Sequence, residues 1–498
     1  MQSQCLPDFR QFSAGTPIAN ALAVATDKCV VVGGGISGLA AAFELQKQRI
    51  PFVVLESAPR FGGLIRTETC DGFVIDAGAD AILTQKPAGV ELCGELGLRL
   101  SPPKTAGTFI ARGGSLRQLP EGAVMGIPTD WRRFATTRAF SPAAKLRIAA
   151  EYLLPVGPAT DDESIASFIK RRFGHEALQY LGEPLLAGIH GGDADRLSMR
   201  ALFPRLLDLE QRHGSVIRGF RQMKSLRAAK PASPFAALAG GMGTLVDALI
   251  NALPPDRLMC GAGVRAIEGG PRWRVHLASG ATLDAAAVVV ATPPRVAAPL
   301  LMHTDPVLAG LCGQIRDVSL VTVALGYDRA TISHPLRGSG FVVPRTEHAN
   351  VSAVTWVSSK WKDRAPLNSA LLRGYLGGAR DPGAIDLDER QLIAKVQEDF
   401  RRFLGITSEP VLARVFRWPR AGVQMEVGHC GLMESIEKRL WQLPGLFMSG
   451  GGFRGVGIAD CVGDARKQAI AVSRYMTEKK LGASFAARDL PSHVRRTS

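Results

Sequence analysis

Three glycines and an acidic residue are the first group in the sequence with recognisable chemistry. Gly33, Gly35 and Gly38 have the spacing G-x-G-x-x-G, and Glu56 follows 18 residues after Gly38. In this pattern the first glycine permits a tight turn, the second lets a pyrophosphate approach the backbone, and the third lets a helix pack closely on a strand. The carboxylate of the acid would accept hydrogen bonds from the ribose hydroxyls. We therefore predict a dinucleotide site over residues 28–56.

The flanking residues supply the strand, helix and strand that such a site requires. The apolar run Cys29–Val32 precedes the turn, a helix-forming segment follows it, and a second apolar run, Phe52–Leu55, ends at Glu56. Glycine-rich turns are common, so this order of elements, and not the glycines alone, favours dinucleotide binding over a structural turn. The fingerprint does not separate a nicotinamide from a flavin dinucleotide.

Two further glycine-rich segments favour a flavin. The first, RFGGLIRT at residues 60–67, lies just beyond the acid-bearing strand. A nicotinamide cofactor has no need of this loop, whereas the extended FAD molecule can be lined by its backbone and by Arg60. The second, GGGFRGVGIAD at residues 450–460, leads into a predicted helix whose N-terminus can place partial positive charge beside the flavin pyrimidine ring.

The sequence pattern in the middle of the chain predicts one mainly helical unit and one unit rich in strands. Residues 115–222 are largely helical in pattern, with Pro and Gly punctuation. Strand-like alternation recurs at residues 264–284, 318–325, 340–344, 351–358 and 371–377. An antiparallel sheet covered by a helix at residues 388–403 is the simplest arrangement for the later strands. His190, in a glycine-rich break, is typical of a loop histidine and not of a catalytic base.

The charge and hydropathy of the chain limit its partners. The 498 residues carry a net charge of +15, which fits either a solvated basic surface or a partner such as nucleic acid, an anionic membrane surface or an acidic substrate. No zinc-finger or RNA-binding pattern supports nucleic acid. No apolar run reaches the ~18 residues of a spanning helix. Segments 130–134 and 141–154 mix basic and apolar residues at helical spacing, which fits either a core helix or one that rests among lipid headgroups.

Eight cysteines are scattered along the chain without a C-x-x-C pair, which predicts reduced thiols, no metal site and a cytoplasmic location. Residues 1–27 lack the features of a secretion signal, and we expect a disordered extension. Any membrane contact is then peripheral or monotopic, at the cytoplasmic face.

The order of these motifs resembles the flavin-dependent amine oxidase superfamily, and within it the oxygen-dependent protoporphyrinogen oxidases. The resemblance to the superfamily rests on the motifs GGGISGLAAAFEL, RFGGLIRT, AGGMGTLVDAL, VVVATPP and SGGGFRGVGIADCVGDAR. The resemblance to the protoporphyrinogen oxidases rests on FIARGGSLRQLPEG and LLAGIHGGDADRLSMRALFP. The match covers residues 28–478 and implies a Rossmann-like FAD-binding domain of discontinuous segments (α/β), a sheet-based substrate domain (α+β) and a helical membrane-binding domain. It also leaves a homodimer open as the assembly state.

The resemblance implies domain boundaries. The FAD-binding domain would comprise residues 28–100, 235–300 and 444–480. The substrate-binding domain would comprise residues 101–114, 216–234 and 301–443. The helical membrane-associated domain would comprise residues 115–215, and residues 481–498 would be a tail. By the same resemblance FAD would contact Gly33, Gly35, Ile36, Ser37, Gly38, Glu56, Ser57, Arg60, Gly62, Gly63, Leu64, Gly78, Val264, Trp418, Gly451, Val456, Gly457 and Ile458.

The implied reaction is the six-electron oxidation of protoporphyrinogen IX to protoporphyrin IX in haem biosynthesis. Each step would pass a hydride to flavin N5, and dioxygen would be reduced to hydrogen peroxide. The sequence demands no acid/base pair. An apolar clamp on the macrocycle would fall at Val342, Trp356 and Tyr375, and Gly188 would offer its carbonyl to pyrrole N–H groups.

One position departs from the family pattern. Many members have an arginine that pairs with a substrate propionate where this chain has Thr108, and threonine cannot form a charge-assisted pair. Arg112 or Lys104 could substitute, the carboxylate could be held more weakly, or the substrate could have another carboxylate pattern, as coproporphyrinogen III has.

Two other functions stay open from the sequence. One is a different flavoenzyme of the superfamily, such as an amine oxidase or a carotenoid desaturase; the last motif offers Phe453 but no aromatic cage pair. The other is a basic membrane-surface or nucleic-acid binding protein that keeps an FAD fold without turnover. Reduction of the flavin by a porphyrinogen, by an amine, or by neither would separate the three.

Overall fold

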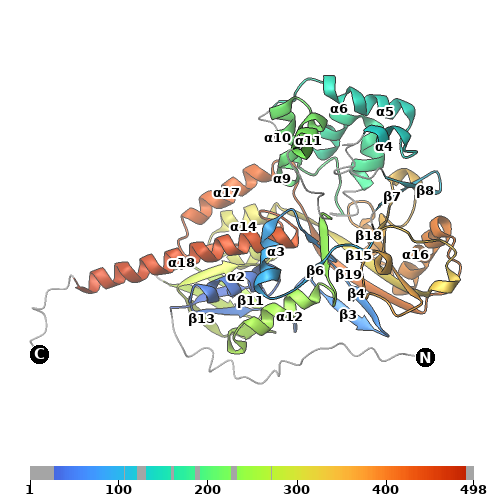
Figure 1. Cartoon of the computed structure of the whole chain (residues 1–498). Helices are drawn as coiled ribbons and strands as arrows, with labels where there is room; N and C mark the ends of the chain where they lie inside the picture. Colours follow the sequence, from blue (N-terminus) through green and yellow to red (C-terminus); the bar gives the residue numbers. More distant parts are fainter. Residues whose placement is uncertain are drawn as a thin grey trace, which may run out of the picture.

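The computed structural model describes residues 27–105, 107–119, 131–158, 162–184, 191–225, 233–270 and 272–488. Figure 1 shows three units: a layered α/β unit that contains the glycine fingerprint, a unit built on a large twisted sheet, and a group of helices above that sheet. We call them the fingerprint unit, the sheet unit and the helical unit.

A five-stranded parallel sheet forms the centre of the fingerprint unit. In spatial order its strands are β10 (Leu258–Met259), β2 (Phe52–Leu55), β1 (Cys29–Val32), β14 (Ala287–Val290) and β20 (Leu446–Met448). Strands β1, β2 and β14 are buried along their whole length, as expected for apolar runs covered on both faces.

Helices and a small sheet cover the two faces of this central sheet. One face packs on α2 (Ile36–Lys47), α3 (Pro87–Glu95), α12 (Gly243–Ala252) and α18 (Ile458–Arg488). The other face packs on the predicted meander, β11 (Val264–Glu268), β12 (Trp273–Leu277) and β13 (Thr282–Ala285), and on α13 (Pro294–Leu301), α14 (Pro306–Gly313) and α17 (His429–Trp441). Segments far apart in sequence therefore share one core, as the discontinuous FAD-domain prediction requires.

Short strands connect the fingerprint unit to the sheet unit. They are the hairpin β3 (Thr67–Cys70) and β4 (Phe73–Asp76), and a small sheet of β5 (Ile82–Leu83), β9 (Phe235–Leu238) and β6 (Leu100–Ser101). The hairpin residues Phe73 and Ile75 pack in one cluster with Leu371 and Phe416 of the large sheet.

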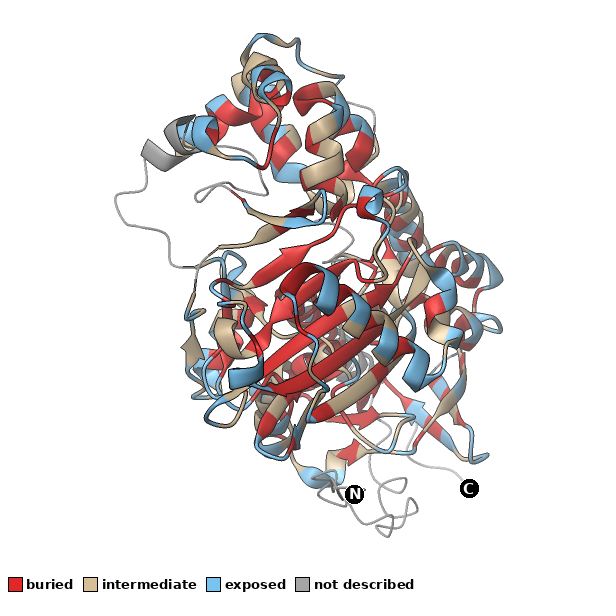
Figure 2. Cartoon of the chain, turned by 90° about the vertical axis from the view of Figure 1, so that its right-hand side faces the viewer, coloured by how far each residue is buried: buried red, intermediate tan, exposed pale blue. Residues whose placement is uncertain are grey.

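The sheet unit is a seven-stranded mixed sheet. Its strands in spatial order are β19 (Leu412–Gln424), β15 (Arg316–Asp328), β18 (Ser369–Gly377), β17 (Ala353–Trp356), β16 (Gly340–Val342), β7 (Phe109–Arg112) and β8 (Ser115–Gln118). Helix α16 (Glu389–Leu404) covers one face, and its N-cap is Asp388 within a capping box. Figure 2 shows the central strands as a continuous buried layer.

The helical unit packs on the opposite face of the same sheet. It comprises α4 (Trp131–Thr136), α5 (Pro142–Ala149), η1 (Ala150–Leu153), α6 (Ile165–Phe173), α7 (His175–Ala177), η2 (Leu178–Gly182), α9 (Met199–Leu202), α10 (Pro204–His213) and α11 (Val216–Ser225). Ile110, Val342 and Ala353 of the sheet belong to its hydrophobic cluster. The Ser141 hydroxyl caps α5, where it accepts a hydrogen bond from the Ala144 N–H at 3.1 Å.

A buried ion-pair network fixes the helices of this unit. Arg172 and Glu151 are both almost fully buried, and the Arg172 Nε donates to Glu151 Oε1 at 3.0 Å. Glu151 also accepts from the Val216 N–H at the start of α11, at 2.8 Å. This carboxylate therefore ties η1, α6 and α11 together.

The observed packing shifts several expected domain boundaries. Helix α11 packs on α10, so residues 216–225 belong with the helical unit and not with the substrate domain. Strand β8 completes the large sheet although it lies within the expected helical segment. Helices α14 and α17 share the core of the fingerprint unit, not that of the sheet unit. Helix α18 continues to Arg488, past the expected limit at residue 480.

Two further expectations concern membranes and thiols. Among the described residues, no helix combines the length and the apolarity that a membrane crossing needs.

Six cysteines of this part of the chain are free, whereas Cys70 is disulfide-bonded. The prediction that all cysteines are reduced is therefore wrong at Cys70.

Candidate active site

The fingerprint turn has the geometry that its glycines predict. A Cβ on Gly33 (φ +108°) would lie 2.8 Å from the Ala291 carbonyl oxygen, and a Cβ on Gly38 would lie only 1.8 Å from the Gly33 oxygen. Around Gly35 the nearest neighbour would be 4.0 Å away, so the backbone is open there. Helix α2 begins at Ile36 without a side-chain N-cap, which leaves its first N–H groups available to an anion.

Glu56 lies against this turn, as expected of the acid that follows β2. Its Oε2 accepts from the Gly34 N–H at 2.6 Å, and its Oε1 accepts from the Ala58 N–H at 2.8 Å. The adjacent Ser57 lies beside Gly263, with 3.7 Å between the Ser57 Cβ and a Cβ built on the glycine, which brings the start of β11 at Val264 to the same place. The structure therefore gathers the residues expected at the ribose end of FAD.

The second glycine loop folds back onto the first. The Gly62 N–H donates to the Gly34 carbonyl at 2.8 Å, and Gly35 forms a bridge with Gly62. Arg60 closes this loop, because its guanidinium donates to the carbonyls of Gly63 at 2.6 Å and Phe61 at 3.1 Å. Burial lowers the pKa of Arg60 from its usual value. Arg60 thus shapes the loop in addition to placing a cation beside it.

The C-terminal loop meets the same turn from the other side. A Cβ on Gly450 (φ +133°) would lie 2.9 Å from the Thr292 carbonyl oxygen, and one on Gly451 would lie 3.7 Å from the Cys461 sulfur. His429, at the start of α17, holds this loop through its Nε2, which is 2.8 Å from the Phe453 carbonyl oxygen. The loop that carries Gly451, Val456, Gly457 and Ile458 is therefore joined to the fingerprint turn, near Ser37.

Buried polar atoms test whether a dinucleotide fits the site formed by the fingerprint turn, the loop at residues 60–67 and the C-terminal loop at residues 450–458, which we call the cradle. Thr292 lies two residues beyond β14 and Ser449 directly follows β20, and the hydroxyls of both are buried without a hydrogen-bond partner among the described residues. Buried polar groups normally have partners, so these hydroxyls call for a polar ligand. Together with the open backbone at Gly35, the bare helix N-terminus and Glu56, they fit FAD.

Three more of the residues expected to contact FAD, Gly78, Leu64 and Trp418, also come together. A Cβ on Gly78 would lie 2.2 Å from the Leu64 oxygen and 3.5 Å from the Trp418 ring. The Trp418 indole donates to the Ala77 carbonyl at 3.1 Å, and the Thr322 hydroxyl donates to the same oxygen at 2.7 Å. Gly78, Leu64 and Trp418 therefore meet where the fingerprint unit contacts the large sheet.

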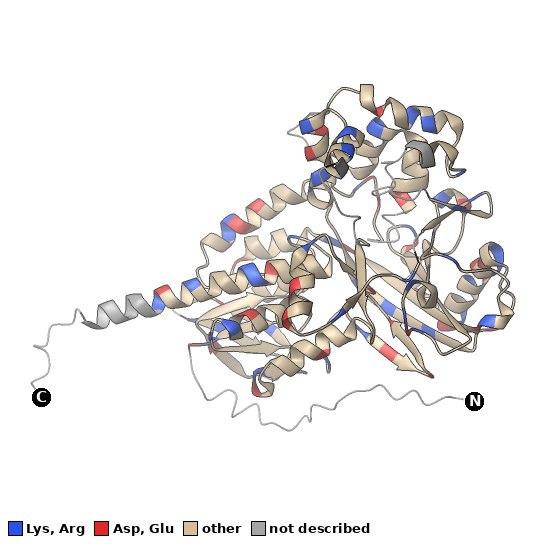
Figure 3. Ribbon diagram, viewed as in Figure 1, with Lys and Arg blue, Asp and Glu red and all other residues tan. Residues whose placement is uncertain are grey.

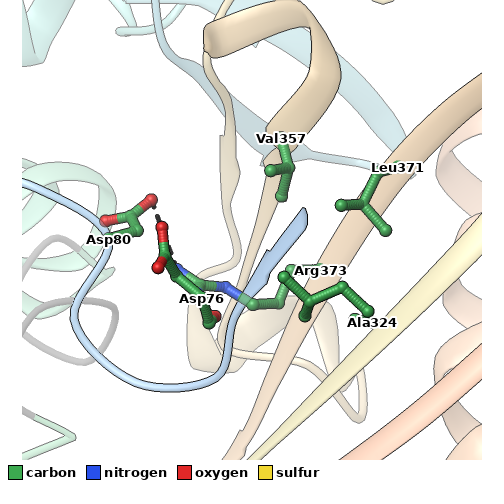
Figure 4. A pocket seen from close by; sticks show the side chains of 7 residues that line it. Asp76, Asp80, Ala324, Val357, Leu371 and Arg373 are labelled. Atoms are coloured by element: carbon green, nitrogen blue, oxygen red, sulfur yellow. Dashed lines mark hydrogen bonds and ion pairs between the residues drawn. The ribbon is translucent and has the colours of Figure 1, made fainter. Parts of the chain in front are cut away.

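A buried charge cluster lies directly behind this contact. Arg373, which is 2% exposed, donates to the carbonyls of Asp76 and Gly78 and to the Tyr375 hydroxyl. It also pairs with Asp80, as does Lys360 at 3.3 Å. Burial opposes the charge on Asp80, but Lys360 and Arg373 outweigh it and hold the pKa of that carboxyl well below its usual range. Figure 4 shows Asp80 and Arg373 of this cluster beside the apolar side chains of Val357 and Leu371.

A second buried arginine stabilises the same hairpin from another side. Arg364 pairs with the Asp76 carboxylate at 3.0 Å and donates to the Leu238 carbonyl at 2.9 Å. Asp76 also accepts from the Thr67 hydroxyl at 2.6 Å and from the Met242 N–H at 2.7 Å. Burial raises the pKa of Asp76, against the opposing effect of Arg364.

The expected substrate residues divide between the two faces of the large sheet. Val342 and Tyr375 both align with Ala353, so they share the face that packs on the helical unit. Trp356 lies on the opposite face, fully buried against Phe109 and Phe341 and under α16. The structure therefore separates Trp356 from the other two members of the expected clamp.

The structure describes the contacts of two further substrate candidates, Arg112 and Thr108. Arg112 donates to Glu176 at 2.7 Å and to the Ala139 carbonyl at 2.6 Å, so its guanidinium holds the helical unit to β7. The Thr108 carbonyl accepts from the Leu119 N–H, which places Thr108 beside the start of β7. Gly188 lies outside the described residues.

Sequence reasoning missed Arg373, Asp80 and Arg364. A signal for Arg373 exists, because this arginine interrupts the apolar run 370–376 in a strand that is otherwise buried. A charged residue in such a place needs buried partners and is a candidate for a structural or functional role.

The cradle predicts the effect of a single methyl group. Gly38→Ala should abolish FAD retention, because its Cβ collides with the Gly33 carbonyl and must displace the turn that holds the pyrophosphate. Gly94→Ala is the matched control, since a Cβ at this helical position meets nothing within 4 Å. Flavin absorbance per mole of purified protein measures the outcome, and equal flavin content in the two variants would contradict the assignment.

Comparison with known proteins identifies the family. Residues 36–473 match the model of the flavin containing amine oxidoreductases. The coproporphyrinogen III oxidase of Bacillus subtilis (strain 168) is 35% identical over 457 residues, which cover 89% of this chain and 97% of that protein. The mitochondrial protoporphyrinogen oxidase of Nicotiana tabacum is 28% identical over 494 residues, or 90% of this chain and 95% of that one.

Solved structures agree with this match. A structure from Exiguobacterium sp. 255-15 superposes with a TM-score of 0.81 at 29% identity and covers 91% of this chain and 99% of its own. Cyclohexylamine oxidase from Brevibacterium oxydans IH-35A, at 16% identity, has a TM-score of 0.68 over 91% of this chain and 99% of its own, and shares the fold. With the cradle described above, these matches show that the chain binds FAD and belongs to the family of flavin-containing amine oxidoreductases.

Proposed function

We propose that this protein oxidises a porphyrinogen to the corresponding porphyrin, with coproporphyrinogen III as the preferred substrate and coproporphyrin III as the product. The observation that carries the substrate class is the match, over nearly their whole length, to relatives named as coproporphyrinogen III or protoporphyrinogen oxidases. Protoporphyrinogen IX is the other candidate substrate, and the family resemblance alone placed it first.

Two observations favour coproporphyrinogen III. The relatives with that name reach 35% identity, against 28% for the tobacco protoporphyrinogen oxidase. Thr108 also stands where many protoporphyrinogen oxidases have a propionate-binding arginine, which fits a substrate whose carboxylates are differently arranged. Coproporphyrinogen III has propionates where protoporphyrinogen IX has vinyl groups.

The residues of the chain orient the substrate and exclude water. When bound, FAD supplies the acceptor for the hydride removed in each two-electron step, with dioxygen as the final oxidant and hydrogen peroxide as the coproduct. Val342 and Tyr375 offer an apolar face to the macrocycle, and Arg373 fixes the Tyr375 hydroxyl at 2.9 Å from its Nε. Positioning of this kind can supply most of the rate without an acid/base pair.

An aerobic assay with two substrates tests the proposal. Purified protein is mixed with coproporphyrinogen III or protoporphyrinogen IX, and porphyrin fluorescence is followed with hydrogen peroxide release. We expect both signals with coproporphyrinogen III, and a kcat/KM at least about tenfold lower with protoporphyrinogen IX, equivalent to ~1.4 kcal/mol of transition-state binding. A higher kcat/KM for protoporphyrinogen IX would reverse the substrate choice. If neither is oxidised while a primary amine bleaches the flavin, the function is wrong.

We also propose a peripheral membrane contact for the helical unit. Leu146 of α5 and Leu153 of η1 are 73% and 86% exposed, and Val156 is exposed just beyond them. The Ala144 and Ile148 side chains of the same segment point into the core, so the exposed leucines are on an outer face. Figure 3 shows Lys and Arg residues on the helices of this unit, and the net charge of +15 favours an anionic surface.

Vesicle binding tests the membrane contact. The double variant L146S/L153S should bind phosphatidylcholine vesicles that contain phosphatidylglycerol at least about tenfold more weakly than the parent chain, because two apolar side chains no longer enter the lipid. Leu367→Ser removes an equally exposed leucine, 91% exposed, from the sheet unit and should leave binding unchanged. Sedimentation with vesicles measures binding, and equal binding of all three proteins would contradict the contact.

A further inference from the structure

A continuous row of residues crosses the sheet face that packs on the helical unit. The register aligns Arg117 of β8 with Ile110, Ile110 with Val342, Val342 with Ala353, Ala353 with Tyr375, and Tyr375 with Thr322. Directly opposed residues in neighbouring strands point to the same face. Arg117 therefore shares the face of Val342 and Tyr375, at the far end of the row.

The two ends of this row differ in what they contact. Thr322 lies at the flavin end, since its hydroxyl donates to the Ala77 carbonyl next to Gly78. Arg117 lies on the outermost strand, which Figure 1 places below the helical unit. Four strand spacings separate Tyr375 from Arg117, or about 19 Å between backbones. A macrocycle whose reacting carbon faces the flavin would direct its far substituents toward Arg117.

Arg117 differs from the other cations near this face. No ion pair or hydrogen bond engages its side chain within the part of the chain that the structure describes, and its Nε is buried without a partner. Arg112 is bound by Glu176 and Ala139, and Arg373 by Tyr375 and Asp80. Lys104 donates to the Ser358 carbonyl at 3.2 Å. Of these four cations, Arg117 alone has no side-chain partner among the described residues.

We infer that Arg117 binds a carboxylate of the porphyrinogen, the task that Thr108 cannot perform. The inference rests on the proposed function and names the cation that selects the substrate at that site. A guanidinium matches a carboxylate in a two-pronged, charge-assisted arrangement, and its partly buried setting strengthens the pair. It also completes the hydrogen bonding of a buried donor that otherwise has no partner.

The test compares Arg117→Gln with the parent enzyme on acidic and esterified substrates. With coproporphyrinogen III, R117Q should raise KM by about tenfold to a hundredfold and leave kcat nearly unchanged, because the anchor acts equally on bound substrate and transition state. With the methyl ester of the same porphyrinogen, the two proteins should have the same KM. Arg99→Gln removes an exposed charge elsewhere and should match the parent throughout.

Restoring the cation at the family position provides an independent check. The double variant R117Q/T108R should recover most of the lost affinity for the acid and leave the KM for the ester unchanged. An unchanged KM in R117Q, or an equal loss for acid and ester, would overturn the role of Arg117. These outcomes are distinct from failure of the proposed function, in which the parent enzyme oxidises neither porphyrinogen.

Discussion

Three successive backbone carbonyls, those of Asp76, Ala77 and Gly78, join the fingerprint unit to the large sheet. Arg373 binds the first and the third, while Thr322 and Trp418 bind the second. All of the donors come from the large sheet, and the carbonyls belong to residues 76–78, where we propose that FAD contacts Gly78. Hydrogen bonds from a charged donor contribute roughly 1.5–3 kcal/mol each. The sheet that would hold the substrate and the segment that meets the cofactor therefore move as one body.

This constraint explains why so much charge is buried where the units meet. Arg373 has to be fully buried to reach both carbonyls, and Asp80 and Lys360 complete its charge balance. Breaking one member of such a cluster leaves an unpaired buried charge, which costs more than the pair contributes. Arg373 also binds the Tyr375 hydroxyl, so the electrostatics that join the units also set the orientation of a ring on the face where we propose that the substrate binds.

Local patterns in the sequence predicted the parts of the site that depend on local geometry. The spacing of Gly33, Gly35 and Gly38 specifies the turn by itself, and alternation identified most strands of the large sheet. The resemblance placed Trp356 in a clamp with Val342 and Tyr375, but the structure puts it on the other face of the sheet. Facing depends on strand register, and a shift of one residue moves a side chain to the other face. The resemblance placed residues 216–234 in the substrate domain, whereas α11 packs on α10, because a resemblance in sequence order does not specify which helix packs on which. Arg373 was missed because the carbonyls it binds lie nearly 300 residues earlier in the chain.

The most direct test of this account is the rate of flavin reduction by coproporphyrinogen III under anaerobic conditions, compared between the parent enzyme and Arg373→Lys. Lysine keeps the buried charge beside Asp80 but cannot bind both carbonyls and Tyr375 at once. The account predicts full FAD content and flavin reduction slowed by at least about tenfold, because the substrate ring is no longer aligned. Arg364→Lys, which alters a buried arginine that does not contact Tyr375, should retain the parent rate. Reduction of Arg373→Lys at the parent rate, or equal slowing of both variants, would contradict it.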